Sequence, residues 1–231
     1  MTVNIPLLLL ALLLLWFPRQ WLRMGAVLFR RRSHSGSGKP GASLEPWNIR
    51  EPGDPSVNFY AEFSKSRNYV DLFRALVGGL CVVGGLHIEP SVMLAENAPA
   101  ATAKGVIAIK GIILLVGLLI QAMRYEKRRF TFYPPIFFLA GLSVGLCEPY
   151  GALFAFILIW AFNPILKSAQ GFLTVYAILQ VVFGNYFSGL GDKTSIYAGI
   201  LCFLPVLLSL MAQRPLVIYA RKGVRSAETK S

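Results

Sequence analysis

Acidic residues are scarce in this sequence. The 231 residues include 11 aspartates and glutamates against 23 lysines and arginines, and charged residues make up only 15% of the chain. An ordinary soluble domain carries about 25% charged residues. This shortage, together with a mean hydropathy of +0.56, argues against a soluble globular protein and indicates an integral membrane protein.

Motifs for catalysis and metal binding are also missing. The two histidines, His34 and His87, lie in unrelated regions, and the sequence has no HExxH, no GxSxG and no acidic metal-binding repeat. The three cysteines, Cys81, Cys147 and Cys202, lie in or at the ends of apolar runs, and none belongs to a CxxC pair. They are predicted to be small hydrophobic residues that face either lipid or the protein core. We therefore expect no metal and no cofactor.

The stretch RRRSHSGSGKPGAS, at residues 30–43, looks superficially like a phosphate-binding loop. That motif needs a glycine five residues before the Gly-Lys pair and a serine or threonine after it. Here Ser33 precedes Gly38 at that distance, and Pro40 follows Lys39. The stretch is instead predicted to be a flexible basic linker near anionic headgroups. Because the basic residues cluster between apolar runs, we expect membrane lipids as partners and no nucleic acid.

Seven apolar runs predict an all-α polytopic transmembrane bundle of six or seven spans. A membrane-spanning helix needs about 20 apolar residues. The runs cover residues 5–17, 69–87, 105–123, 132–147, 150–166, 168–187 and 194–212. The fourth and fifth, if fused, would extend over ~52 Å, far more than the ~30 Å hydrocarbon layer. A tight hairpin with CEPYG at its apex is the preferred interpretation, and a re-entrant pair is the alternative.

The distribution of lysine and arginine predicts the orientation. With the N-terminus outside, twenty of the 23 basic residues fall on the cytoplasmic side or at its boundary. Only Lys104 and Lys193 fall outside, and Lys110 lies within a span. Fusing the fourth and fifth runs would place Lys167 and the basic tail outside, against the positive-inside rule. We therefore predict a bacterial inner-membrane protein with seven spans and a cytoplasmic C-terminus.

The first run admits two interpretations. No basic residue precedes it and no small-x-small cleavage site follows it, which argues against a removable signal peptide. An uncleaved anchor fits the charges, while Arg19 and Arg23 just after Pro18 also fit a partly inserted interfacial helix. The predicted organisation is an anchor helix at 1–29, a basic cytoplasmic linker with an interfacial helix at 30–68, the bundle at 69–213 and a basic tail at 214–231.

A short amphipathic surface helix is predicted in the cytoplasmic segment. Asp54 followed by proline is typical of a helix start, and Phe59 and Phe63 share one face. We expect this face to lie on the inner leaflet, or alternatively to bind a cytoplasmic partner. Asn68 is predicted to be the N-cap of the second span, with Asp71 as the acidic residue three positions later.

Lys110 interrupts the third span, which lies in the stretch KGVIAIKGIILLVGLLIQAM. Its predicted depth is about 8 Å below the outer end of that helix. The lysine side chain is long enough to reach back to the interface, which is one interpretation. The other pairs Lys110 with an acid at the same depth, first Glu148 at the hairpin apex and then Glu89.

A polar pocket near the outer face is the candidate site, formed by His87, Glu89, Lys110, Glu148 and Asp192. His87 beside Glu89 is too little for a metal site. At the inner boundary, Asp71 and Arg74 are three positions apart on one helix and are predicted to pair locally.

Glycines predict close helix packing. Gly141 and Gly145 share one face of the fourth span, as in the GxxxG pattern of membrane helices. Gly78 and Gly79 give the second span a smooth face of its own.

Three classes of function follow. The leading one is a non-catalytic membrane subunit or scaffold that packs against partner helices, other copies of itself or lipids. The second is a small transporter or lipid-handling protein that uses the region of Lys110 and Glu148. The third is an intramembrane enzyme acting on a lipid-linked substrate.

Overall fold

The chain folds mainly into helices. A computed structural model describes residues 2–18, 57–87, 100–126, 129–189, 193–214 and 216. Its helices are α1 (Ile5–Trp16), α3 (Phe59–Phe63), α4 (Ser66–Gly85), α6 (Ala100–Ala122), α7 (Ile136–Leu146), α8 (Pro149–Phe162), the 3₁₀ turn η2 (Asn163–Ile165), α9 (Ala169–Ser188) and α10 (Lys193–Met211). The predicted helical architecture is confirmed.

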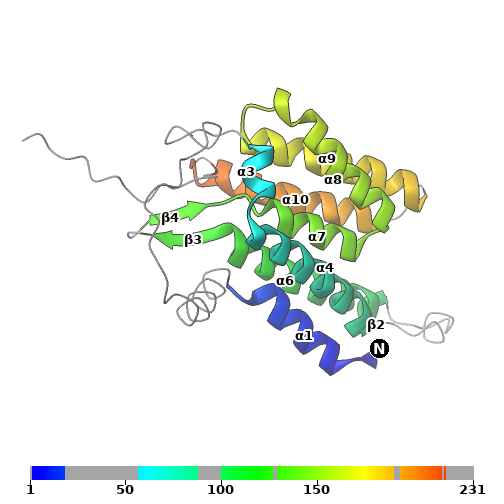
Figure 1. Cartoon of the computed structure of the whole chain (residues 1–231). Coiled ribbons are helices and arrows are strands. Elements are labelled where there is room, and N and C mark those ends of the chain that lie inside the picture. Colours follow the sequence, from blue (N-terminus) through cyan, green and yellow to red (C-terminus); the bar gives the residue numbers. More distant parts are fainter. Residues whose placement is uncertain are drawn as a thin grey trace, which may run out of the picture.

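Two short antiparallel strand pairs lie at opposite ends of the bundle (Figure 1). The strand β1 (Thr2–Val3) pairs with β2 (Leu86–His87), and β3 (Met123–Glu126) pairs with β4 (Arg129–Phe132). These pairs define the β1–β2 end and the β3–β4 end of the bundle.

Three of the described helices are long and apolar enough to cross a bilayer, as an integral membrane protein requires. Their apolar windows are Gly105–Ala122, Ala169–Ser188 and Lys193–Met211. Three further apolar segments are shorter, namely Ile5–Trp16, Ile136–Leu146 and Pro149–Ile165. Length and hydropathy alone therefore support three crossings.

The helices alternate in direction along the chain. The start of α1 lies at the end of α4, because the Asn4 amide donates to the Gly85 carbonyl. Leu15, near the end of α1, lies against Gly78 in the middle of α4. These two helices are therefore antiparallel. The pair α8 and α9, and the pair α9 and α10, are antiparallel as well, and α7 runs parallel to α4. In Figure 1, α1 lies at one edge of the bundle, α8 and α9 lie at the other, and α4 and α7 lie between them. The predicted hairpin is confirmed, because the ring of Phe137 at the start of α7 lies 6.2 Å from that of Trp160 near the end of α8.

The predicted start of the second span is wrong. Helix α4 begins at Ser66 with Lys65 as its N-cap residue, so Asn68 lies inside the first turn. The Asn68 Nδ2 atom instead donates to the backbone oxygen and to the Oε2 of Glu62, both at 2.8 Å. Asn68 thus joins α3 to α4 across six positions of the chain, a role that its cap-like sequence position concealed.

The predicted start of the fourth span is also wrong. The prediction begins that helix at residue 132. In the structure, residue 132 is the last residue of strand β4, and α7 begins at Ile136. Two prolines, Pro134 and Pro135, precede it, and a proline disfavours helical backbone in the residue before it. The Tyr133 amide donates to the Ala122 carbonyl at 2.8 Å. The strand pair therefore carries the chain from the end of α6 to the start of α7.

The phenylalanines of helix α3 pack against the bundle, and Phe59 also remains 41% exposed. The predicted position of this helix on the inner leaflet stays a prediction. The ring centroid of Phe63 lies 5.0 Å from that of Trp160 and 5.1 Å from that of Phe137. Phe59 lies 5.4 Å from Trp160 in an edge-on geometry, a favourable arrangement for aromatic pairs. The predicted helix start at Asp54 lies outside the described residues.

Glycines bring α4 and α7 into backbone contact. A Cβ atom on Gly141 would overlap the carbonyl oxygen of Leu72, and one on Gly145 would lie 2.5 Å from the carbonyl oxygen of Leu76. On the facing helix, a Cβ on Gly79 would lie 3.3 Å from the Gly145 backbone. Small residues permit this approach, and dispersion between the two backbones stabilises it.

We expect Gly141→Ala to lower the free energy of unfolding by about 1–3 kcal/mol, because α4 and α7 must separate to admit the methyl group. The measurement is reversible unfolding in mixed micelles. The matched control is Gly111→Ala in α6, where a Cβ would meet no atom within 4 Å. That change should stabilise the protein by roughly 0.5–1 kcal/mol through helix propensity. Equal effects of the two substitutions would contradict the proposed role of the crossing.

Candidate functional site

Lys110 binds the end of a neighbouring helix. Its Nζ donates to the carbonyl oxygen of Val83 at 3.3 Å. Val83 lies in the last turn of α4, where carbonyl groups have no partner within the helix. A cation there also interacts favourably with the negative end of the helix dipole. The structure therefore explains how a lysine in an apolar helix is accommodated: Lys110 of α6 caps α4.

Glu148 binds the start of a helix in the complementary way. It is the N-cap residue of α8, and its Oε2 accepts a hydrogen bond from the Gly151 amide at 2.8 Å. A carboxylate is stabilised at this positive end of the helix dipole. Within the described part of the chain, no ion pair joins Lys110 to Glu148. Each of these two charges has its partner at a helix end.

The other members of the predicted pocket are only partly described. His87 belongs to β2, where it lies opposite Thr2. Glu89 and Asp192 lie outside the described residues. The convergence of all five side chains therefore stays a prediction. What the structure does place together at the β1–β2 end is Lys110, the last turn of α4 and the start of α1.

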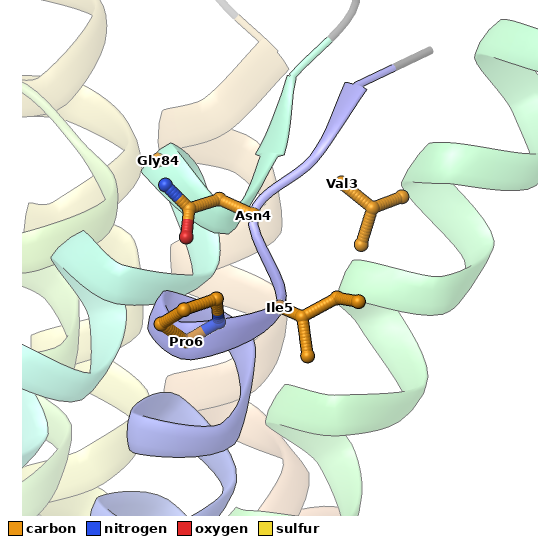
Figure 2. Close-up of a pocket in the computed structure, with 5 residues that line it drawn as sticks. All are labelled: Val3, Asn4, Ile5, Pro6 and Gly84. Atoms are coloured by element: carbon orange, nitrogen blue, oxygen red, sulfur yellow. The ribbon is translucent and has the colours of Figure 1, made fainter.

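A shallow pocket of about 520 Å³ lies at this junction, lined by Val3, Asn4, Ile5, Pro6 and Gly84. Figure 2 shows Asn4 and Pro6 on the side of Gly84, with Val3 and Ile5 on the other side of the chain. The polar groups of Asn4 have structural partners: its Oδ1 accepts from the Leu7 amide at 3.3 Å, and its backbone amide donates to the Gly85 carbonyl at 2.9 Å. The pocket is therefore a helix junction that offers one polar side chain.

A buried charged cluster lies at the other end of the bundle. Arg74 and Asp71, which are 8% and 3% exposed, form an ion pair of 2.9 Å, so the predicted local pairing is confirmed. Arg74 also donates to Gln121 Oε1 at 2.5 Å and to the Phe17 carbonyl at 2.7 Å. Its guanidinium lies over the ring of Phe138, at 5.5 Å from the centroid. We call Asp71, Arg74 and Gln121 the α1 clamp.

The α1 clamp holds the C-terminus of α1. Gln121 Nε2 donates to the carbonyls of Phe17 at 3.1 Å and Leu15 at 3.3 Å, and Arg74 donates to the first of these. Helix α1 ends at Trp16, so the carbonyls of Leu15 and Phe17 have no donor within the helix and are satisfied by these side chains. Sequence reasoning missed this cluster. The sequence feature that could have revealed the cluster is Gln121, an amide side chain in the last turn of an apolar helix.

A second set of buried polar groups lies between α7, α9 and α10. Gln180 Nε2 donates to the Tyr176 hydroxyl at 2.9 Å, and Ser143 Oγ lies 3.7 Å from the sulfur of Cys202. These side chains are at most 2% exposed. They satisfy one another and neighbouring carbonyls, as buried polar groups in a membrane helix bundle must. The Ser143–Cys202 contact joins α7 to α10, and Gln180 also donates to the Ala152 carbonyl of α8 at 3.4 Å.

Metal chemistry has no support in the described ranges. No group of three histidine, cysteine or acidic side chains lies close enough there to hold a metal ion. Comparison of the chain with protein-family models, curated proteins and solved structures finds no match.

We expect Arg74→Met to lower the free energy of unfolding by about 3–5 kcal/mol, because Asp71 would remain buried beside an apolar side chain. Adding Asp71→Asn should recover part of the loss, since it removes the unpaired charge. Unfolding in mixed micelles measures both. The matched control is Arg67→Met, on the exposed part of the same helix, which should change stability by less than about 0.5 kcal/mol. Similar losses for Arg67→Met and Arg74→Met would refute the clamp.

Proposed function

We propose that the chain is a bacterial inner-membrane protein that crosses the bilayer seven times, with its N-terminus outside and its C-terminus in the cytoplasm. The strict alternation of α1, α4, α6, α7, α8, α9 and α10 supports this count, because consecutive crossings must alternate. The orientation rests on the excess of lysine and arginine in the sequence segments that the positive-inside rule assigns to the cytoplasm. Among the described residues, Arg124, Arg129, Lys167 and Arg214 lie toward the β3–β4 end. We assign that end to the cytoplasm.

The short helices fit such a bundle. Helix α7 has 11 residues, or roughly 17 Å of length, which is well below the ~30 Å hydrocarbon layer. Nine of those residues are buried, however, so α7 contacts protein rather than lipid. A helix surrounded by protein need not match the bilayer, since its flanking backbone is also shielded from lipid.

The long helices carry the lipid-facing surface. Only 39% of the Gly105–Ala122 window and 33% of the Ala169–Ser188 window is buried inside the protein. Large apolar side chains such as Ile112 and Ile200 are 60% and 58% exposed. An apolar surface of this extent favours contact with hydrocarbon or with the helices of a partner.

We further propose that the protein serves as a non-catalytic subunit or scaffold. The observation that carries this proposal is the use of its charged side chains: Lys110, Glu148 and Arg74 each bind a helix end. Such charges stabilise the bundle and are already occupied. The second candidate, a small transporter or lipid-handling protein, is favoured by the pocket at the β1–β2 end, whose lining residue Gly84 follows Val83, the partner of Lys110.

Cysteine labelling tests the orientation. In a chain whose three native cysteines are replaced by alanine, Lys193→Cys should react with an impermeant thiol reagent added to intact cells. Lys167→Cys should react only after the membrane is opened. Both positions are exposed in the structure, so protection reports the membrane rather than burial. The opposite pattern is expected if α7 and α8 act as a single crossing, and it would refute the seven-span arrangement.

Purification in a mild detergent tests the subunit proposal. We expect a stoichiometric partner protein to accompany the chain, and to remain with the double variant Lys110→Met, Glu148→Gln, because those side chains act at helix ends within the chain. The measurement is the mass and composition of the purified complex. A chain that purifies alone with a bound solute, and loses the solute in the double variant, would favour the transporter instead.

A further inference from the structure

An apolar groove of about 550 Å³ runs between α9 and α10. Its lining includes Thr174, Ile178 and Val182 of α9 and Ile196, Ile200 and Leu207 of α10. The floor is narrow because Gly199 lies against the Val181 side chain, where a Cβ would overlap it. The side chains of Ile178, Val182 and Ile200 form the walls and project outward, since they are 56%, 53% and 58% exposed.

The groove has the chemistry of a hydrocarbon site. Thr174 supplies its only hydroxyl, and this Oγ1 already donates to the Gln170 carbonyl at 2.9 Å. A polar ligand would therefore lose hydrogen bonds to water without replacing them. The narrow floor between Gly199 and Val181 suits a single extended acyl chain.

The groove leads toward two cations at the β3–β4 end. There, Gln170 Nε2 donates to Ser209 Oγ at 2.9 Å and fixes the ends of α9 and α10 together. The exposed Lys167 precedes α9, and the exposed Arg214 follows α10. Lys167 lies seven residues before Thr174, or roughly 10 Å along a helix axis. This spacing places the positive charges at headgroup level when the groove lies in hydrocarbon.

We propose that this groove binds one acyl chain of an anionic phospholipid, with its phosphate near Lys167 and Arg214. The inference rests on the proposed membrane insertion and adds a lipid class and a position to it. Basic residues near a membrane surface each favour an anionic headgroup by about fivefold in affinity. The groove supplies the hydrocarbon contact, and the two cations supply the selectivity for charge.

Native mass spectrometry of the delipidated full chain in detergent tests the proposal. The probes are phosphatidylglycerol and phosphatidylcholine with identical acyl chains. We expect the protein to bind phosphatidylglycerol at least about fivefold more tightly. The double variant Lys167→Gln, Arg214→Gln should reduce this preference to less than about twofold, because only the headgroup contact is lost.

Groove-filling variants test the acyl-chain contact. Ile200→Trp should weaken binding of both lipids, and Ile178→Trp on the opposite wall is a second variant with the same expected result. The controls are Lys193→Gln at the other end of α10 and Ile157→Trp on α8, which is 67% exposed and does not line the groove. Both controls should bind as the unchanged protein does.

Equal binding of the two lipids would overturn the proposal, and so would lipid binding that neither groove variant changes. A third contrary result is that both groove variants lose a bound protein partner while they still bind lipid. The last result would identify the groove as a helix-docking site. Because the measurement is made in detergent, it does not depend on which way the chain is oriented in cells. Failure of the lipid site is therefore distinguishable from failure of the topology.

Discussion

The backbone groups at helix ends are the constraint on which this structure depends. In hydrocarbon no water is present to satisfy them, so each unpaired group costs several kcal/mol. Here side chains satisfy several of them, some from other helices and one from the N-cap residue of the same helix. Lys110 reaches the last turn of α4, Glu148 accepts from the start of α8, and Arg74 and Gln121 donate to the end of α1. Three charges of the described residues, Lys110, Glu148 and Arg74, thus complete helix ends.

Close packing between α4 and α7 is the second requirement. Glycines on both helices let the backbones touch, and α7 becomes the buried element around which the others are arranged. This position explains why α7 can be short. It also explains why polar groups such as Ser143 and Gln180 are tolerated deep in the bundle, since both face protein on every side.

Hydropathy and loop charge predicted the helices well and their contacts poorly. Most apolar runs correspond to helices within a few residues, and the α7–α8 hairpin followed from length alone. The start of α7 was predicted wrongly because the spacing of apolar residues does not report that residues 129–132 pair as a strand. The role of Asn68 was predicted wrongly because its partner, Glu62, belongs to another helix. At the candidate site, the local pair of Asp71 and Arg74 was predictable. The contacts to Gln121 and Phe17 were not, because they join residues separated by 47 and 57 positions.

The separation between α1 and its clamp has a consequence for biosynthesis. The carbonyl groups of Leu15 and Phe17 are synthesised first, whereas Gln121, which binds them, follows 106 and 104 positions later. A nascent chain therefore inserts its first helix with an incomplete end, and only the arrival of α4 and α6 closes it. The N-terminal helix is the first segment to be made, yet its end is completed only after α6 has been synthesised.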